Sequence, residues 1–139
     1  MKHKTVEQVM NPIRKTLGER ASLSEAREIM RASCIRHIPV VDFKGVAVGI
    51  LSDRDIKLAS AMPGAKNFTV ADAMTPDPYV VPRNEKFETV IAEMSAHKYG
   101  SVIVVDDLNR VCGIVTTSDA LLSLVNYIKK DEADFFDLT

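Results

Sequence analysis

The chain has 139 residues, the usual size of a single globular domain with its own hydrophobic core. Apolar residues make up 46% and charged residues 27%, as is typical of soluble globular proteins, and the formal net charge is −1. Such a balance excludes the strong electrostatic attraction of a basic protein to nucleic acid, so we expect no nucleic-acid partner. No apolar run approaches the roughly 20 residues that span a bilayer, and no secretory signal is recognisable, so we expect no membrane partner and a cytoplasmic protein. Cys34 and Cys112 fit no metal-binding spacing.

The sequence contains an internal duplication with a constant spacing of 64 residues. Residues 6–59 align with residues 70–123 without a gap and give 12 identities in 54 positions, where ordinary composition would give about three by chance. The duplication predicts two similar units. We expect a first unit at 1–61, a linker at 62–68, a second unit at 69–128 and an acidic C-terminal tail at 129–139.

Each repeat predicts the same order of elements. A short helix capped by a threonine comes first, then an extended segment, an amphipathic helix, two apolar strands and a last helix. In the first repeat the longer elements are a helix from Ser22, strands at 38–42 and 46–51 and a helix from Asp53; in the second they are a helix after Asn84, strands at 102–106 and 111–116 and a helix from Ser118. The predicted fold class is α/β (α+β), with two pseudo-symmetric β-α-β-β-α units packed through their sheets into one module.

A hydroxyl residue ends the last strand of each repeat, and an aspartate follows three positions later in the first turn of a helix. These pairs are Ser52 with Asp55 and Thr116 with Asp119. One interpretation is structural, because this is the spacing of a capping box and an aspartate in the first turn is stabilised by the helix dipole. The other is functional, because amides at a helix start attract phosphate and a carboxylate can accept hydrogen bonds from both ribose hydroxyls. Spacing alone favours the cap and leaves binding open.

Three motifs occur in the same order in both repeats and resemble the cystathionine β-synthase domain, or CBS domain. They are Met-x-Pro, the strand segment His37-Ile38-Pro39-Val40-Val41-Asp42, and the segment Gly49-Ile50-Leu51-Ser52-x-x-Asp55. The resemblance covers about residues 6–124. In that family two units form one module, modules pair into flat dimers, and clefts between the units bind AMP, ADP, ATP or S-adenosylmethionine. The resemblance therefore implies a regulatory module with an adenosine-containing ligand and no catalytic cofactor, a homodimer, and a regulated protein partner.

The resemblance also implies two clefts with Asp119 and Asp55 as the ribose anchors. One would combine Thr116, Thr117, Ser118 and Asp119 with the stretch around Arg14–Thr16, including Thr16, and with Arg36, His37 and Ile38. The other would combine Ser52, Asp53, Arg54 and Asp55 with Tyr79, Val80, Gly100, Ser101 and Val102. Ser101 stands where the first repeat has His37, which removes a possible cation, and Asp53 adds a carboxylate that should repel phosphate. We therefore expect the cleft of Asp119 to bind more tightly.

Two further classes of function compete with sensing. The first is a non-catalytic scaffold whose clefts are vestigial and whose helices serve dimerisation. The second is an enzyme, but the sequence has no nucleotide-binding glycine loop, no zinc spacing and no nucleophile paired with a base, so we expect neither catalysis nor a metal site. The terminal helices carry more apolar residues than one module needs internally, which predicts a homodimer: Ile56, Leu58, Ala59, Leu121, Leu122, Leu124 and Val125. The charged tail is expected to fray, although Phe135 and Phe136 could dock on a partner.

Overall fold

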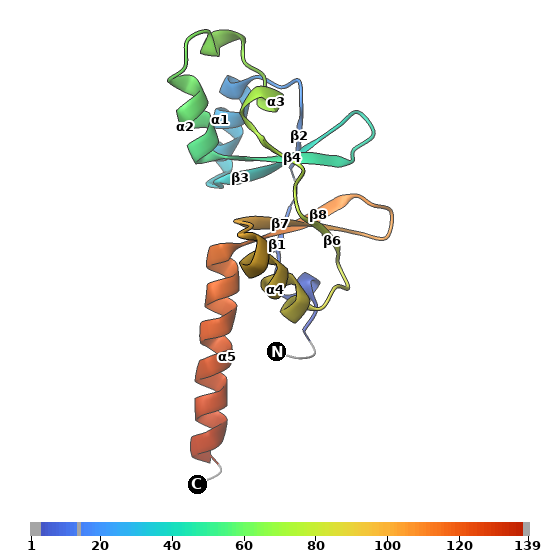
Figure 1. Cartoon of the computed structure of the whole chain (residues 1–139), viewed down its shortest axis with the longest axis vertical. Coiled ribbons are helices and arrows are strands. Elements are labelled where there is room, and N and C mark those ends of the chain that lie inside the picture. The colour runs from blue at the N-terminus through green and yellow to red at the C-terminus, as the bar shows by residue number, and fades with distance from the viewer. Residues whose placement is uncertain (1–3, 14, 138–139) are drawn as a thin grey trace.

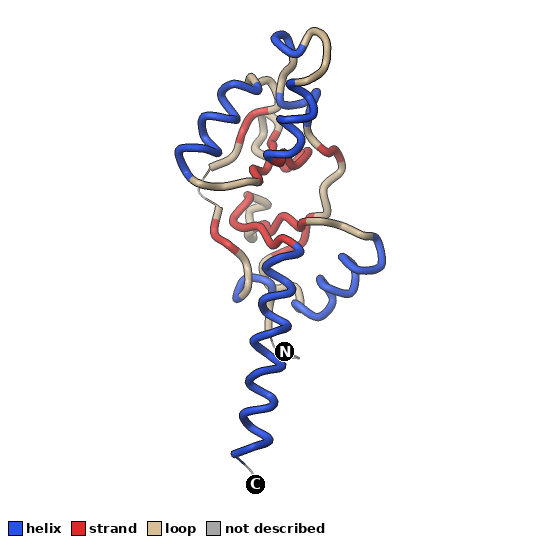
Figure 2. Tube along the Cα trace, turned by 90° about the vertical axis from the view of Figure 1, so that its left-hand side faces the viewer, coloured by secondary structure: helices blue, strands red, loops and turns tan. Residues whose placement is uncertain are grey.

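The structure is a computed structural model that describes residues 4–13 and 15–137, with side chains described up to Glu132. It is a mixed α+β fold whose described residues form two four-stranded sheets and five α-helices. Figure 1 shows two units along the long axis of the molecule, with the last helix extending away from the second unit. Figure 2 shows the strands of the two sheets facing each other in the middle of the molecule and the helices outside them. The fold class predicted from the duplication is confirmed.

The first sheet has the order β2 (Leu17–Gly18), β3 (His37–Val41), β4 (Ala47–Ser52) and β5 (Thr75–Pro76). The second has the order β1 (Asn11–Pro12), β8 (Val111–Thr116), β7 (Ser101–Val105) and β6 (Val80–Pro82). The helices of the first unit are α1 (Leu23–Ser33), α2 (Asp53–Ser60) and α3 (Val70–Ala73). Those of the second are α4 (Phe87–His97) and α5 (Thr117–Asp137), and short 3₁₀ turns occupy Val6–Gln8 and Ala65–Asn67. The second 3₁₀ turn lies within the predicted linker.

The spatial units differ from the sequence repeats because the repeats exchange their first segments. Strand β1 of the first repeat pairs with β8, and β5 of the second repeat pairs with β4, both antiparallel. The amide of Val6 donates to the carbonyl of Glu85 at 2.8 Å, and the amide of Val70 donates to that of Ala21 at 2.8 Å. Each repeat therefore completes the sheet and the core of the other. The two repeats that meet at residues 61–69 are therefore not two independently folded units.

Three apolar clusters hold this arrangement together. Val6 is buried with Phe87, Val90 and other residues of the second unit, while Val70 is buried with residues of the first unit. A third cluster joins the two sheets: Ile50, Ile103, Val105 and Ile114. Alternate side chains of a strand point to opposite faces, so each central strand contributes to its own unit and to the junction between units.

The exchanged segments explain why the repeats share Met-x-Pro and Gly-Ile motifs. The side chain of Met10 lies against Gly113, and that of Met74 lies against Gly49. A Cβ atom added to Gly113 would lie 2.8 Å from Cγ of Met10, and one added to Gly49 would lie 2.9 Å from Cγ of Met74. Since such contacts are too short for carbon atoms, glycine is needed where the methionine of the other repeat crosses the strand.

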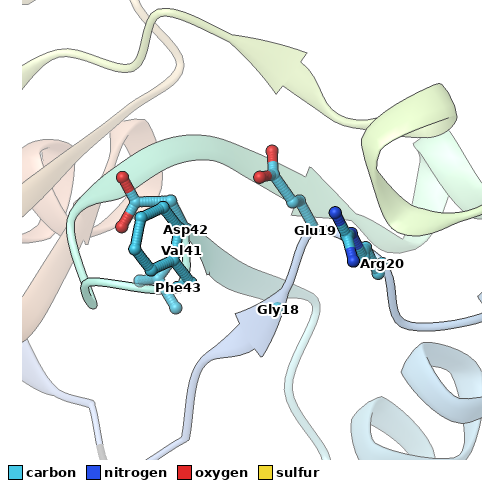
Figure 3. Close-up of a pocket in the computed structure, with 6 residues that line it drawn as sticks. All are labelled: Gly18, Glu19, Arg20, Val41, Asp42 and Phe43. Carbon is cyan, nitrogen blue, oxygen red and sulfur yellow. The ribbon is translucent and has the colours of Figure 1, made fainter.

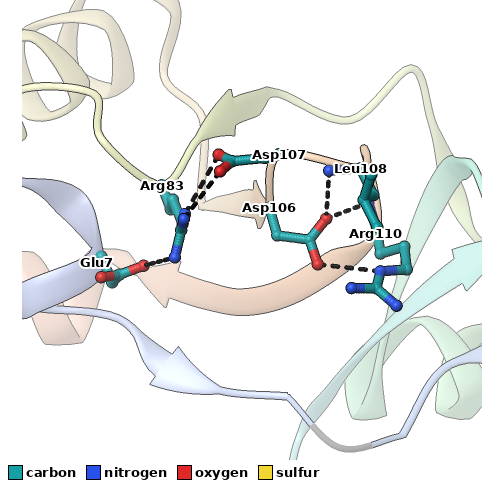
Figure 4. A network of polar contacts seen from close by, with 6 residues as sticks. All are labelled: Glu7, Arg83, Asp106, Asp107, Leu108 and Arg110. Carbon is teal, nitrogen blue, oxygen red and sulfur yellow. Dashed lines mark hydrogen bonds and ion pairs between the residues drawn. The ribbon is translucent and has the colours of Figure 1, made fainter.

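A shared aspartate closes the turn between the two long strands of each unit. In the second unit, Oδ1 of Asp106 accepts hydrogen bonds from the amides of Leu108 and Arg110 at 2.9 and 3.0 Å (Figure 4). Beside it, the Arg83 guanidinium contacts the carboxylates of Asp107 at 2.9 Å and Glu7 at 3.4 Å, which links the exchanged N-terminal segment to the second unit. The backbone amides of Arg110 and Leu108, together with the Arg110 guanidinium, hold the pKa of the Asp106 carboxyl below its usual value. The recurrence of this aspartate is therefore explained by the turn.

Helix α5 differs from the expectation for the C-terminal tail. Its backbone remains helical from Thr117 to Asp137, where the sequence analysis expected residues 129–139 to fray. The physical reason is that residues 117–137 contain neither proline nor glycine, so nothing in the sequence ends the helix. The side chains of Phe135 and Phe136 lie outside the described residues. Within the part of the chain that the structure describes, no helix is long and apolar enough to cross a membrane.

Candidate functional site

The Thr116–Asp119 segment lies where β8 passes into α5. Oδ2 of Asp119 accepts hydrogen bonds from the amide and the hydroxyl of Thr116, both at 2.8 Å. The amide of Asp119 donates to the hydroxyl oxygen of Thr116 at 3.4 Å. The two residues thus form a reciprocal cap, and the carboxylate is held in the first turn of α5, half-buried.

The equivalent Ser52–Asp55 segment has the same geometry where β4 passes into α2. The amide of Ser52 donates to Oδ2 of Asp55 at 2.9 Å, and the amide of Asp55 donates to Oγ of Ser52 at 3.0 Å. The structural interpretation of both pairs is therefore confirmed as far as capping goes. Capping does not exclude binding, because a carboxylate has two oxygens and about four acceptor positions.

Asn11 distinguishes the two caps, and the sequence analysis missed it. Its Nδ2 donates to Oδ2 of Asp119 at 2.8 Å, so three donors converge on this one oxygen. Asn11 is the middle residue of the first Met-x-Pro motif and lies in the exchanged strand β1. The corresponding residue of the second motif is Thr75. Only the pairing of β1 with β8 brings Asn11 to Asp119, and no local pattern in the sequence indicates that pairing.

His37 lies near both aspartates. It begins β3 and pairs in register with Ser52 of its own unit. Burial lowers its pKa from the usual 6.5, the carboxylates of Asp55 and Asp119 act in the opposite direction, and Arg36 lowers it further. Asp55, in the same unit as His37, raises its pKa more than Asp119 does, which lies in the other unit. His37 is therefore adjacent to the Ser52 junction and also within electrostatic range of the Asp119 junction.

The lowered pKa of His37 predicts a dependence of stability on pH. The unfolded chain binds a proton to this imidazole near pH 6.5, whereas the folded chain resists protonation until a lower pH. The free energy of unfolding should therefore be largest above pH 6.5 and should fall as the pH drops through the folded-state pKa. Urea denaturation between pH 5 and 8 measures this slope. The variant His37→Gln should flatten it between pH 5 and 6.5, and an unchanged slope would show that other groups cause it.

The remaining predicted residues fall into exposed and buried groups. The side chains of Ile38 and Val102 are fully buried in the cores of their own units, so these residues could face a ligand only with their backbone atoms. Strand alternation explains this, because their neighbours His37 and Ser101 point the other way. The place of Ile38 and Val102 at the two clefts stays a prediction. Ser101 pairs in register with Thr116. Exposed residues at the strand and helix ends complete the set: Thr16, Arg36, Arg54, Val80, Thr117 and Ser118.

Two details modify the roles expected for these residues. The hydroxyl of Thr117 donates to the carbonyl of Gly100 at 3.2 Å, so it joins α5 to the start of β7 within one unit. Arg14, which the resemblance grouped with Thr16, lies outside the described residues.

Tyr79 stacks on Tyr99 with ring centroids 4.9 Å apart, and Tyr99 stacks on His97 at 5.3 Å. This aromatic group at the end of α4 was not predicted.

Surface cavities occur at both ends of the first sheet. One of about 390 Å³ lies at the turn between β3 and β4 (Figure 3), lined by Gly18, Glu19, Arg20, Val41, Asp42 and Phe43. Its Asp42 is used to close that turn, because Oδ1 accepts from the amides of Lys44 and Val46. Another of about 410 Å³ lies at the opposite end, beside Arg36 and Asp53. Among the described residues, no group of three or more histidines, cysteines and carboxylates could hold a metal ion.

The comparison with protein families decides what this arrangement is. The family model of the CBS domain matches residues 6–61 and 70–126, which together make up most of the chain. The chain belongs to the CBS domain family. The resemblance inferred from the duplicated motifs is thereby confirmed.

The proteins related to this chain include much longer ones and one of similar length. The chain is 34% identical over 122 residues to homoserine O-acetyltransferase of Methanocorpusculum labreanum, covering 87% of the chain and 24% of that protein. It is 36% identical over 104 residues to L-aspartate semialdehyde sulfurtransferase of Methanocaldococcus jannaschii, covering 75% and 20%. The chain thus spans a quarter or less of these relatives. By contrast, it covers 93% of a CBS domain-containing protein of Dictyostelium discoideum at 28% identity, with 89% of the chain aligned.

Solved structures with the same fold include complexes with adenosine compounds. The CBS pair of protein MJ0100, solved with 5′-methylthioadenosine and S-adenosylmethionine, has a TM-score of 0.74 at 29% identity and covers 89% of this chain and 98% of its own. The CBS domain of a bacterial CNNM/CorC magnesium transporter, solved with ATP, has a TM-score of 0.76 at 25% identity and covers 89% of each. An acetoin utilization protein, AcuB, of Vibrio cholerae has a TM-score of 0.74 at 29% identity and covers 94% and 96%.

Proposed function

We propose that this CBS pair is a regulatory module that binds an adenine nucleotide, with the ribose on the carboxylate of Asp119. The observation that carries the proposal is the position of this carboxylate, fixed in the first turn of a long helix by Thr116 and by Asn11 of the exchanged strand. All three hydrogen bonds end on Oδ2, and among the described residues Oδ1 has no partner. An oriented carboxylate oxygen beside a helix start suits a ribose hydroxyl followed by phosphate.

The Asp55 junction is proposed as the weaker site. Its carboxylate is held by the same cap, but Asp53 places a second negative charge in the same helical turn. Lys57 offsets part of that charge, because its Nζ lies 3.1 Å from Oδ2 of Asp53. The proposed difference in affinity between the two sites therefore rests on Asn11, which holds the Asp119 carboxylate, as much as on the charge of Asp53.

The solved complexes support an adenosine ligand by analogy. Two proteins with TM-scores of 0.74 and 0.76 to this chain were solved with S-adenosylmethionine or with ATP. Proteins that share a fold need not share a ligand, so the residues at the cleft have to carry the assignment. A binding measurement with AMP, ADP, ATP and S-adenosylmethionine identifies the preferred ligand.

Regulation would follow from a difference in ligand affinity between two arrangements of the module. A ligand changes the populations of two states only as far as it binds one of them more tightly. The partner that would respond is a separate protein or a further domain. The competing function is a scaffold with unused clefts.

A thermal-shift experiment with AMP, ADP, ATP and S-adenosylmethionine separates sensing from scaffolding. A ligand at 100 times its dissociation constant adds about 2.7 kcal/mol to the free energy of unfolding, which raises the melting temperature of a domain of this size by several degrees. We expect at least one compound to do so at millimolar concentration, with guanosine monophosphate as the control. No shift with any adenosine compound would favour the scaffold.

We also propose a homodimer, with a smaller contact surface than the sequence suggested. Ile56 and Ala59 are buried in the first unit, so they cannot contribute. Exposed apolar side chains remain on α2 and α5: Leu58, Leu121, Leu122, Val125 and Ile128. The variant Leu122→Glu should convert a dimer to a monomer in sedimentation experiments at tens of micromolar, because it places a charge in an apolar contact. Leu108→Glu, in the exposed turn between β7 and β8, is the control, and a parent that sediments as a monomer would refute the proposal.

A further inference from the structure

Three arginines line one cavity at the end of the first unit. The cavity measures about 410 Å³ and lies between the C-terminal half of α1 and the start of α2, lined by Arg27, Met30, Arg31, Cys34, Ile35, Arg36 and Asp53. Helix α1 ends there because Cys34 adopts a left-handed conformation, with φ of 54°, which turns the chain back toward Arg36 and β3. The turn thus brings a third guanidinium beside two that the helix presents at a spacing of four residues.

The charges in this cavity are only partly neutralised. Arg31 pairs with Glu28 on its own helix at 2.9 Å, and Arg27 donates to the hydroxyl of Ser60 at 2.7 Å. Among the described residues, Arg36 has no carboxylate partner in hydrogen-bonding range. The one acidic lining residue, Asp53, has Lys57 at 3.1 Å. Exposed ion pairs such as Arg31 with Glu28 are weak and exchange readily with an incoming anion.

The duplication shows that the fold does not require these arginines. The second unit has an equivalent cavity of about 320 Å³ between α4 and α5, in which Ile91 and Ser95 occupy the places of Arg27 and Arg31. Gly100 stands where the first unit has Arg36. The same surface is therefore mainly apolar in one unit and basic in the other.

We propose that Arg27, Arg31 and Arg36 form a binding pocket for phosphate groups. Guanidinium groups bind phosphate oxygens through paired N–H donors, and three of them around one cavity suit a di- or polyphosphate better than a single carboxylate. Arg36 directly precedes His37, whose imidazole is within electrostatic range of Asp119. The terminal phosphates of a nucleotide bound at Asp119 are one source of the anion, and this part rests on the proposed function. A free polyphosphate is the other source.

The double variant Arg27→Gln/Arg31→Gln tests the pocket, with calorimetric titrations of ATP, AMP and inorganic tripolyphosphate. The matched control is Arg20→Gln/Lys44→Gln, which removes the same charge from exposed residues near the β3–β4 turn. If the pocket holds nucleotide phosphates, ATP should bind the double variant at least about fivefold more weakly while AMP changes by less than about twofold. If it holds free polyphosphate, tripolyphosphate should bind the parent and the control but not the double variant, whether or not the affinities for ATP and AMP change.

Two results would contradict the proposal that the three arginines bind phosphate groups. One is that ATP and tripolyphosphate interact with the double variant as they do with the parent. The other is that ATP and AMP weaken equally and tripolyphosphate does not bind the parent, because the arginines would then act on the ribose cleft alone. A parent that binds no nucleotide contradicts the proposed function, and tripolyphosphate binding still decides whether the pocket exists.

Discussion

Replacement of Phe87 by alanine should lower the free energy of unfolding by about 3–5 kcal/mol, as expected for a buried aromatic residue whose removal leaves a cavity. Phe87 is fully buried in the core of the second unit. It packs in the same cluster as Val6, which arrives from the other repeat, and its amide donates to the carbonyl of Lys4 at 2.9 Å. The loss should therefore loosen the exchanged N-terminal segment as well as α4.

The chain supplies a matched control for this substitution. Phe43 is 93% exposed in the turn between β3 and β4, so Phe43→Ala should change the free energy of unfolding by less than about 0.5 kcal/mol. Urea denaturation followed by circular dichroism measures both variants. Equal effects of the two substitutions would contradict the described core.

Replacement of Asp119 by asparagine should weaken adenine-nucleotide binding at least tenfold, which corresponds to about 1.4 kcal/mol. A carboxylate can accept charge-assisted hydrogen bonds on both oxygens, whereas an amide offers one acceptor oxygen. In this protein that single oxygen would be needed by Thr116 and Asn11, so the NH₂ group would face the ribose. The cap itself should survive, with a cost to folding on the order of 1 kcal/mol from the lost charge at the helix start.

Asp55→Asn is the internal comparison, because Asp55 occupies the same place in the other repeat. It should weaken binding less than Asp119→Asn if the Asp119 cleft is the tighter site. Calorimetric titration of ATP or AMP and thermal melting of the unliganded variants should be carried out together. If both variants bind like the parent but melt several degrees lower, the two carboxylates serve only as caps.

The duplication made most of the fold predictable. The order of elements in each repeat, the capping role of Ser52 and Thr116 and the two pairs of long strands follow from local patterns, which neighbouring residues determine. The exchange of β1 and β5 did not follow from these patterns. Antiparallel pairing of Asn11 with Ile114 joins residues far apart in sequence, and two-residue strands carry no periodicity of their own.

The two aspartates of the proposed site could be singled out from the sequence, whereas the residues around them were harder to foresee. Asp55 and Asp119 stand out because they recur at the same position. Asn11 could not be found, because its contact with Asp119 depends on the exchange. The buried positions of Ile38 and Val102 could have been inferred, since strand alternation separates them from His37 and Ser101. The arginine cavity requires the turn at Cys34, whose left-handed backbone is unusual for a residue other than glycine.

A crystal structure with ATP, at a concentration that saturates the thermal shift, tests the central claim most directly. We predict that the ribose hydroxyls lie within hydrogen-bonding distance of the Asp119 carboxylate, with the phosphates directed toward the start of α5 and toward Arg36 and His37. A nucleotide bound away from both aspartates, or a well-ordered crystal in which both aspartate clefts hold only solvent, would contradict the account.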